Sequence, residues 1–421
     1  MSKKKSKRQD TGRAESTDRP AAVSRDTRKT DFGREIANWL FPIYLAVILV
    51  GFLLIHIFGM TTPNGVRALF TAINAATLTG FRQNPGLSSF NALGQWIVLV
   101  LVIAGSLFSM IVGGMAVTRV TGMRFSDRRI AIAAAVAIAT ALAIGAVLPR
   151  EPDQTLVSIF LLTVGAFANC GLYLGHLPSE SSLLTHLLIL PLTILGGLGL
   201  PVLMECWSAV LYFKPLSKHS RVVLVMSAGA YVIGFALLVG LDLAAHHWKE
   251  WSASNAVKVG SVLAVQSRTG GLPIVPFSQT SAAMLWVVII LMGVGASPAG
   301  TGGGLKTTTL VELFRGTRDL LEGRPGRRSL GIAVVWLGAY AAMVIFAVIL
   351  FSHVNPTNSS DGLIFNAVSA VSNVGFSISE VPDERRAMFG YSAVMLLGRM
   401  VPLMILWWLA DTTKDGEWAI G

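Results

Sequence analysis

Long apolar stretches alternate with short polar ones along almost the whole chain. Eight of the apolar stretches come near the ~20 residues that an α-helix needs to cross the hydrocarbon core of a bilayer. These stretches are residues 37–58, 92–118, 129–148, 182–212, 221–245, 279–298, 329–352 and 389–410. The pattern predicts an all-α polytopic membrane protein with eight membrane spans.

A second pattern recurs in the connection after every other apolar stretch. Each of these four connections holds a half-apolar segment too short to cross a membrane, followed by a glycine and a bulky apolar residue. The segments read "FTAINAATLTGF", "LLTVGAFANCGL", "SVLAVQSRTGGL" and "FNAVSAVSNVGF", which aligns Gly80, Gly171, Gly271 and Gly375. Amphipathic surface helices would give no reason for the same glycine to follow four times. We therefore interpret the chain as four repeats of helix, short helix, loop and helix around one central pore.

The repeats divide the chain as follows: 37–118 is repeat 1, 119–212 repeat 2, 213–314 repeat 3 and 315–410 repeat 4. Residues 1–36 carry 11 Lys and Arg and few apolar side chains, so we expect a disordered basic cytoplasmic tail there. Residues 411–421 are expected to form a short cytoplasmic tail. Prolines at 63 and 152 suit the first turns of two of the short helices.

Composition and charge support a membrane protein and exclude other classes. Charged residues make up only 14% of the chain, whereas an ordinary soluble enzyme has about a quarter. If the N-terminus is cytoplasmic, the inner segments carry 24 Lys and Arg and the outer segments carry 8, as the positive-inside rule requires. The net charge of +11 therefore indicates orientation in the plasma membrane, with both termini cytoplasmic and lipids as neighbours, and not nucleic-acid binding.

Glycine loops that follow short helices favour a cation path. Backbone carbonyls on a ring of loops can replace the hydration shell of an ion. Glycine permits positive φ and close backbone approach, and the C-terminus of a short helix carries partial negative charge. Irregular backbone at membrane depth is tolerated only where it is buried in protein or lines a watery cavity.

Two other functions compete with a cation path. The stretch "GASPAGTGGGLKTTT" resembles a phosphate-binding loop, but Leu305 stands where that motif requires glycine before Lys306, so the enzyme interpretation fails. A secondary transporter for an organic solute predicts paired helix interruptions in two halves, whereas the sequence indicates four outer loops and one inner break. Cys170 and Cys206 are placed toward opposite faces, so no disulfide is expected, and no cofactor motif occurs.

The order and spacing of "TLTGF", "NCGL", "RTGGL" and "NVGF", with "LLGRMVP" in the last helix, resemble the Trk/Ktr/HKT superfamily of potassium transporters over residues 37–410. Eight spans and a short tail resemble its KtrB type. The resemblance implies potassium, and alternatively sodium, as substrate, with no cofactor in this chain. It implies ion coordination by backbone carbonyls at Leu78, Thr79, Gly80, Asn169, Cys170, Gly171, Thr269, Gly270, Gly271, Asn373, Val374 and Gly375.

Individual filter positions refine that expectation. Sodium-selective plant members carry serine where this chain has Gly80, which favours potassium over a sodium-permeable or sodium-coupled alternative. Gly270 stands where the superfamily more often has alanine, a departure that predicts a looser third strand and weaker selectivity. Cys170 is a second departure and a candidate thiol-sensitive point.

The resemblance also implies a gate and partners. A glycine-rich intramembrane loop would plug the pore through Gly300, Thr301, Gly302, Gly303 and Gly304; each such glycine costs about 1 kcal/mol of helix propensity relative to alanine. Arg399, which costs about 2.5 to 3.5 kcal/mol at a bilayer centre, is expected to bind that loop, the alternative being an arginine that snorkels to an interface. Lys306 is interpreted as a snorkelling residue. The partners implied are a second copy of this chain and cytoplasmic nucleotide-binding regulatory subunits of the RCK/KTN type.

Overall fold

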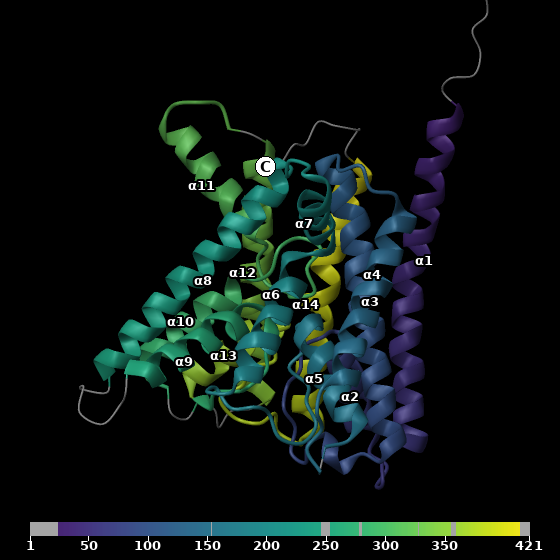
Figure 1. The fold of residues 1–421 in the computed structure, drawn as a ribbon, viewed down its shortest axis with the longest axis vertical. Helices are drawn as coiled ribbons and strands as arrows, with labels where there is room; N and C mark the ends of the chain where they lie inside the picture. Colours follow the sequence, from purple (N-terminus) through teal and green to yellow (C-terminus); the bar gives the residue numbers. More distant parts are fainter. Residues whose placement is uncertain are drawn as a thin grey trace, which may run out of the picture.

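The computed structural model describes residues 24–412 except 153, 246–252, 278–279, 327 and 355–358. Within these residues the repeated secondary structure is helical, with isolated β-bridges only (Figure 1). The long helices are α1 (Ser24–Leu54), α3 (Ala92–Thr121), α4 (Asp127–Val147), α8 (Lys218–Ala245), α12 (Arg328–Val354) and α14 (Arg385–Thr412).

Shorter helices fill the space between the long ones. Four of them precede the aligned glycines: α2 (Gly65–Ala76), α5 (Leu156–Ala168), α9 (Ala253–Val265) and α13 (Ser360–Val371). The other four are α6 (Leu190–Leu198), α7 (Leu200–Tyr212), α10 (Ala282–Gly293) and α11 (Thr307–Leu321). Single turns complete the set: η1 (Ile55–Gly59), η2 (Leu87–Ser89), η3 (Thr185–Ile189) and η4 (Gln266–Gly270).

The helices long and apolar enough to cross a membrane number six among the described residues. A seventh candidate is the pair Thr185–Leu198 and Leu200–Tyr212, which bends by 106°. The predicted span 279–298 is not one continuous helix, because α10 has only 12 residues and ends at Gly293. Over its described residues the chain is thus an all-helical multi-pass protein, and the count of eight spans stays a prediction.

The bend between α6 and α7 overturns the expectation of a single inner break. Gly199 takes a φ of +86° at the junction, where a residue with a side chain is strained, and Pro201 follows in the first turn of α7. The described residues therefore contain two interruptions, one between α6 and α7 and one between α10 and α11. The number of breaks no longer argues against a broken-helix transporter for an organic solute.

Both ends of the described chain differ from the sequence expectation. Residues 24–36, predicted to be disordered, are the first turns of α1, and residues 1–23 lie outside the described range. A helix that already exists extends at little cost, because each added residue gains a hydrogen bond without a new nucleation step. At the other end α14 continues to Thr412, and the rest of the predicted tail 411–421 lies outside the described residues.

The short helices also begin later than the prolines suggest. Asn64 caps α2 by accepting the backbone N–H of Arg67, 3.2 Å away, and Thr155 caps α5 in the same way. Pro63 and Pro152 therefore precede the helices and do not occupy their first turns. Side-chain caps with an oxygen acceptor outweigh the preference of proline for the first turn at both sites.

Helix contacts close the repeats into a ring. Each short helix before a glycine packs between long or broken helices of its own repeat, as α2 does between α1 and α3 and α13 between α12 and α14. Successive repeats touch through α3 and α4, α6 and α9, and α10 and α13, and α14 packs back on α2 and α3. This order places the four aligned glycines near one another at the centre.

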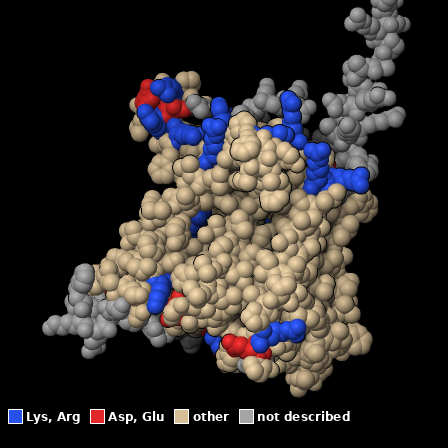
Figure 2. Space-filling view, viewed as in Figure 1, with Lys and Arg blue, Asp and Glu red and all other residues tan. Residues whose placement is uncertain are grey.

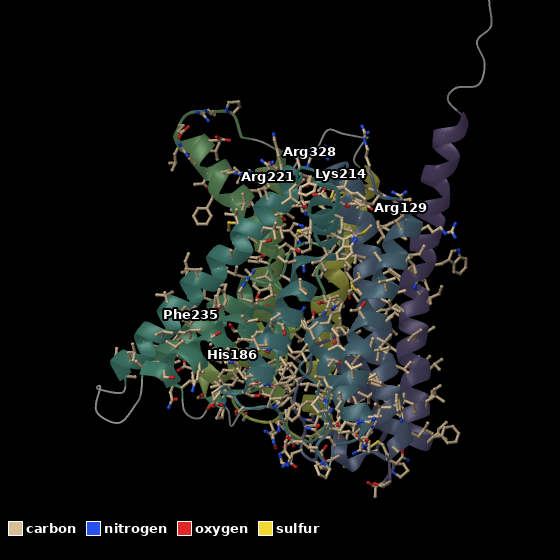
Figure 3. The ribbon with its side chains drawn as sticks, in the orientation of Figure 1. Arg129, His186, Lys214, Arg221, Phe235 and Arg328 are labelled. Atoms are coloured by element: carbon tan, nitrogen blue, oxygen red, sulfur yellow. The ribbon has the colours of Figure 1, made fainter. Side chains whose placement is uncertain are left out.

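One end of the molecule collects positive charge. The first turn of α1 and the last turns of α14 lie at the same end in Figure 1. Figure 3 places Arg129, Lys214, Arg221 and Arg328 at that end, and Figure 2 shows more Lys and Arg there than on the opposite end of the same face. All four labelled residues fall in or beside segments predicted to face the cytoplasm.

Candidate ion path and inner loop

We call residues 77–81, 168–172, 268–272 and 372–376 the glycine loops 1 to 4. Their central glycines form a ring through direct backbone contact. A Cβ atom added at Gly80 would overlap the backbone of Gly171, and one at Gly171 would overlap the carbonyl of Gly271. A Cβ at Gly271 would overlap the Val374 carbonyl, and one at Gly375 would overlap the Thr79 carbonyl. Glycine is required at this ring because any larger residue would push the strands apart.

Three of the four glycine loops share an unusual backbone conformation. The residue two before the glycine takes a positive φ in loops 1, 2 and 4: 58° at Leu78, 55° at Asn169 and 48° at Asn373. Non-glycine residues in this region are strained, and such strain gathers at functional sites. The conformation redirects successive carbonyl groups, which suits a backbone that must present several of them to one ligand.

Loop 3 departs from this pattern by one residue. In loops 1, 2 and 4 the residue before the glycine donates its N–H to the carbonyl five residues earlier, over 2.9–3.1 Å. In loop 3 the glycine itself, Gly271, makes the corresponding bond to Gln266, over 3.0 Å. The cause is the wider helical turn η4, which includes Gly270. Gly270 therefore lies in the one glycine loop whose hydrogen-bond register is shifted, and the looser strand expected from the sequence stays a prediction.

Buried polar side chains fix the loops. The Asn74 amide oxygen accepts the N–H groups of Gly80 (2.8 Å) and Phe81 (3.0 Å), so α2 holds loop 1 in place. The Asn373 amide nitrogen donates to the Thr79 hydroxyl over 3.0 Å, which joins loops 4 and 1. Cys170 is fully buried and unpaired with Cys206, as expected, so its thiol is inaccessible in this conformation.

Residues 294–306, here called the inner loop, lie beneath the ring. The backbone is irregular but internally bonded: Gly295 N–H donates to Leu305 O and Ala296 N–H to Gly303 O, over 3.0 and 3.1 Å. A Cβ at Gly303 would overlap the Ser372 carbonyl of loop 4, and one at Gly302 would lie 2.9 Å from the Thr269 side chain of loop 3. The glycines of "AGTGGG" thus permit contact with the loops above.

The broken end of α6 provides a seat for the inner loop. The last carbonyls of an α-helix have no partner within the helix. Here the Gly196 carbonyl accepts from Thr301 N–H over 3.2 Å, and the Gly197 carbonyl accepts from Ser297 N–H over 3.1 Å. The Ser297 hydroxyl donates to the Leu198 carbonyl. The break at Gly199 therefore frees the acceptors that hold the inner loop.

Thr301 joins the inner loop to three other parts of the molecule. Its hydroxyl donates to the Phe167 carbonyl over 3.2 Å and contacts the Asn169 side-chain amide over 2.6 Å, which joins the inner loop to loop 2. Arg399 on α14 donates from Nη1 to the Thr301 carbonyl over 2.7 Å. The same guanidinium donates from Nε to the Thr77 carbonyl of loop 1 over 2.8 Å. The expected bond between Arg399 and the glycine-rich loop is present.

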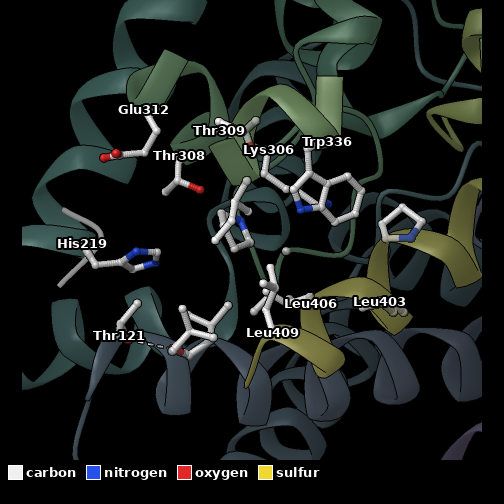
Figure 4. A pocket seen from close by; sticks show the side chains of 18 of the residues that line it. Thr121, His219, Lys306, Thr308, Thr309, Glu312, Trp336, Leu403, Leu406 and Leu409 are labelled. Carbon is white, nitrogen blue, oxygen red and sulfur yellow. Dashed lines mark hydrogen bonds between the residues drawn. The ribbon is translucent and has the colours of Figure 1, made fainter. Parts of the chain in front are cut away.

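A cavity of about 110 Å³ lies on the other side of the inner loop (Figure 4). Its lining includes Arg399, Lys306, Glu312, His219 and Trp336. Neither ring nitrogen of His219 has a hydrogen-bond partner among the described residues, although the residue is buried. Buried polar groups normally pair with protein or water, so we expect this cavity to hold water.

Lys306 has a role that the sequence did not reveal. The sequence favours a snorkelling residue, but the Lys306 Nζ donates to the Gly302 carbonyl over 2.9 Å. The side chain folds back on the inner loop from the loop's own C-terminal end. Lys306 directly precedes α11 and makes no side-chain cap bond to it, and its bond to Gly302 depends on the curled backbone between the two residues.

Comparisons with known proteins match this architecture. Residues 183–379 match the TrkH family, described as a cation transport protein. The chain is 23% identical to the potassium/sodium uptake protein NtpJ of Enterococcus hirae, covering 89% of this chain and 91% of that protein. It is 25% identical to the Ktr system potassium uptake protein B of Vibrio alginolyticus, covering 87% and 90%.

The potassium transporter TrkH of Vibrio parahaemolyticus has the same fold, with a TM-score of 0.65 at 18% identity over 83% of this chain and 79% of that one. The chain is therefore similar, in sequence and in fold, to potassium and cation transporters of the Trk and Ktr type. The matched proteins are transporters and not enzymes, which agrees with the failed phosphate-loop motif at Leu305.

The structure brings the filter and gate residues predicted from the sequence into one region. The proposed filter positions in the four glycine loops are buried around the glycine ring, and the proposed gate residues lie directly beneath. The sequence did not reveal the polar supports Asn74, Thr301 with Asn169, and Lys306, nor the seat on α6. These residues hold the loops through contacts that the folded backbone creates. A single sequence does not show which residues come together in this way.

Proposed function

We propose that this chain takes up potassium ions through the ring of glycine loops and that the inner loop gates the path. The observation that carries the proposal is the position of the inner loop, which contacts glycine loops 2, 3 and 4 through Thr301, Gly302 and Gly303. Arg399 of α14 joins it to loop 1, because the same guanidinium bonds the Thr301 and Thr77 carbonyls. A segment held in this way is suited to plug the path and, once released, to open it.

Backbone chemistry supports a cation as the substrate. Carbonyl groups of the glycine loops line the ring, with that of Thr79 against Gly375 and that of Val374 against Gly271, and carbonyl oxygens coordinate cations without a fixed negative charge. The four short helices end at the ring, so their partly negative C-termini add a favourable field for positive ions. On this proposal the coordinating residues are those predicted from the sequence, from Leu78 to Gly80 in loop 1 and at the matching positions of loops 2 to 4.

Eight membrane crossings in four repeats follow from the same proposal. The six long helices and the bent pair α6–α7 give seven crossings, and α10, the inner loop and α11 together give the eighth. The basic end of the molecule then faces the cytoplasm, and the chain lies in the plasma membrane with both termini inside.

Partners are proposed from the relatives. Several are named as components of a Ktr system. We propose that this chain likewise works as a homodimer with cytoplasmic nucleotide-binding regulatory subunits of the RCK/KTN type, which would act on the inner loop from the basic end.

Sodium permeation is the second candidate function. It is favoured by the shifted geometry of loop 3 at Gly270 and Gly271, because four unequal strands enclose a less uniform coordination site. NtpJ is itself named a potassium/sodium uptake protein. Reversal potentials in mixed potassium and sodium solutions distinguish the two functions.

Flux measurements test the proposal. Purified protein in liposomes should pass radioactive rubidium under an imposed membrane potential, and labelled amino acids or sugars should stay outside. Potassium-limited growth of an uptake-deficient cell, with and without a candidate regulatory partner, tests the same activity in vivo. If liposomes passed neither rubidium nor potassium, the proposed ion path would be lost; uptake of an organic solute would support the broken-helix alternative.

A further inference from the structure

Arg268 is a buried cation of loop 3 that joins three separate segments. It lies in η4, three residues before Gly271, and its side chain is directed away from the glycine ring toward the inner loop and α8. Nη2 donates to the Gly295 carbonyl over 3.1 Å, Nε donates to the Val294 carbonyl over 3.4 Å, and Nη1 donates to the Ser227 carbonyl over 3.3 Å. All three acceptors are backbone carbonyls, so the bonds depend on backbone position and not on any one side chain.

Two of those carbonyls mark the base of the inner loop. Val294 pairs with Leu305 as an isolated β-bridge, and Gly295 N–H donates to Leu305 O over 3.0 Å, so this is where the inner loop begins and ends. Arg268 therefore holds the base, whereas Arg399 holds the middle of the inner loop at Thr301. The base cannot shift without breaking the Arg268 bonds or moving loop 3.

Space for such a movement lies beside Arg268. A cavity of about 300 Å³ is lined by Arg268 and Thr269 of loop 3, Ala296 of the inner loop, and Ser227 and Ala228 of α8. Figure 2 shows a hollow in the tan face beside α8, with a blue side chain recessed in it. Since packed interiors leave few voids, a cavity at this junction allows the base of the inner loop to move there without first displacing other side chains.

We propose that Arg268 is a positioning residue that couples loop 3 to the base of the inner loop, so that gating and ion selectivity change together. The inference rests on the proposed function and adds a mechanical link between the proposed gate and the proposed filter. When the inner loop is released, its base carries the Arg268 side chain with it and alters the backbone at Thr269 and Gly270. In the closed state the same bonds keep the base against the ring.

The test uses the full-length chain with Arg268→Gln and Arg268→Lys, and Arg150→Gln as a control that removes an exposed charge outside these contacts. Hydrogen exchange followed by mass spectrometry gives a readout that does not need flux. Arg268→Gln should raise exchange in peptides covering both 294–306 and 269–272, Arg268→Lys should restore part of the protection, and the control should match the original protein. Unchanged exchange in 294–306 would overturn the coupling, even if the protein passed no cation.

Flux then separates coupling from a general loss of packing. In liposomes Arg268→Gln should raise basal rubidium flux and shift the reversal potential toward sodium. In a background with Gly302 and Gly303 deleted, the same substitution should raise flux no further, because the base restrains only an intact inner loop. The inference would be contradicted if the substitution and the deletion raised flux by factors that multiply in the combined variant. It would also be contradicted if Arg268→Gln raised flux with no change in selectivity. Absence of flux from the original protein would count against the proposed function instead.

Discussion

Arg399 reaches the carbonyl oxygen of Thr301 across 2.7 Å, although 98 residues separate the two in sequence. The same guanidinium bonds the Thr77 carbonyl, so one buried cation connects α14, the inner loop and glycine loop 1. A charge in this position is expensive unless its donors are satisfied, and here the satisfying groups belong to the proposed gate and filter.

Replacing Arg399 should therefore release the inner loop. Hydrogen bonds to a charged group contribute about 1.5 to 3 kcal/mol, so loss of the bond to Thr301 in Arg399→Gln should raise basal rubidium flux in liposomes by about tenfold or more. Arg399→Lys keeps the charge with a different geometry and should give an intermediate flux. Equal or lower flux in well-folded Arg399→Gln protein would show that this side chain does not hold the gate closed.

Thr301→Val tests the opposite side of the same loop. Valine has nearly the shape of threonine but lacks the hydroxyl that bonds the Phe167 carbonyl and contacts the Asn169 amide. Removal of neutral hydrogen bonds of about 1 kcal/mol should raise basal flux by about fivefold, less than the effect at Arg399. Thr308→Val, at the neighbouring start of α11, is the matched control and should leave the flux near its original value. A larger rise in flux for Thr308→Val than for Thr301→Val would show that Thr301 is not the residue that keeps the inner loop closed.

Gly80→Ser tests the ring itself. A side chain at Gly80 would overlap the backbone of Gly171, and the φ of +92° already disfavours any residue but glycine. The ring must then widen or distort, so we expect a reversal potential shifted toward sodium. Gly86→Ser is the control, because a Cβ there meets its nearest atom only at 3.9 Å. Unchanged selectivity in Gly80→Ser would remove loop 1 from the proposed filter.

Much of this architecture could be predicted from the sequence, because the signals for it lie in short stretches of the chain. Apolar stretches predicted six long helices correctly, and a glycine after each of four short helices located the ring at Gly80, Gly171, Gly271 and Gly375. Arg399 could be assigned a partner because a charge in an apolar helix has few ways to be satisfied. Each of these predictions depends on a residue type and its immediate neighbours.

The bend at Gly199 and the role of Lys306 could not be predicted from short stretches of the sequence. The bend at Gly199 depends on hydrogen bonds that the inner loop supplies from about 100 residues away, such as Ser297 N–H to Gly197 O. Within one sequence the run "ILGGLGLP" reads as a glycine-containing helix as readily as a break. The prediction for Lys306 was wrong for a related reason, since its bond to the Gly302 carbonyl exists only because the backbone between the two residues curls back.

Arg82 and Glu380 form an ion pair of 3.3 Å at the opposite mouth of the ring from the inner loop, beside a cavity of about 200 Å³ that Gly80 and Gly171 also line. Val381 N–H donates to the Arg82 carbonyl over 3.2 Å, so the backbones of repeats 1 and 4 stay joined when either side chain is changed. The pair therefore allows the charge of the mouth to be altered without opening the ring.

Arg82→Gln should leave the Glu380 carboxylate unpaired and make the mouth more attractive to cations. At low ionic strength we expect a lower half-saturating concentration for rubidium uptake, with an unchanged maximal rate, because the charge acts on approach and not on passage through the ring. Both side chains are partly exposed, so salt should screen the effect, and it should vanish near 1 M choline chloride, where the Debye length is about 3 Å. The double variant Arg82→Gln with Glu380→Gln should return the half-saturating concentration to its original value. A change in maximal rate, or one that persists in high salt, would mean that the pair supports the ring mechanically and does not set the field at its mouth.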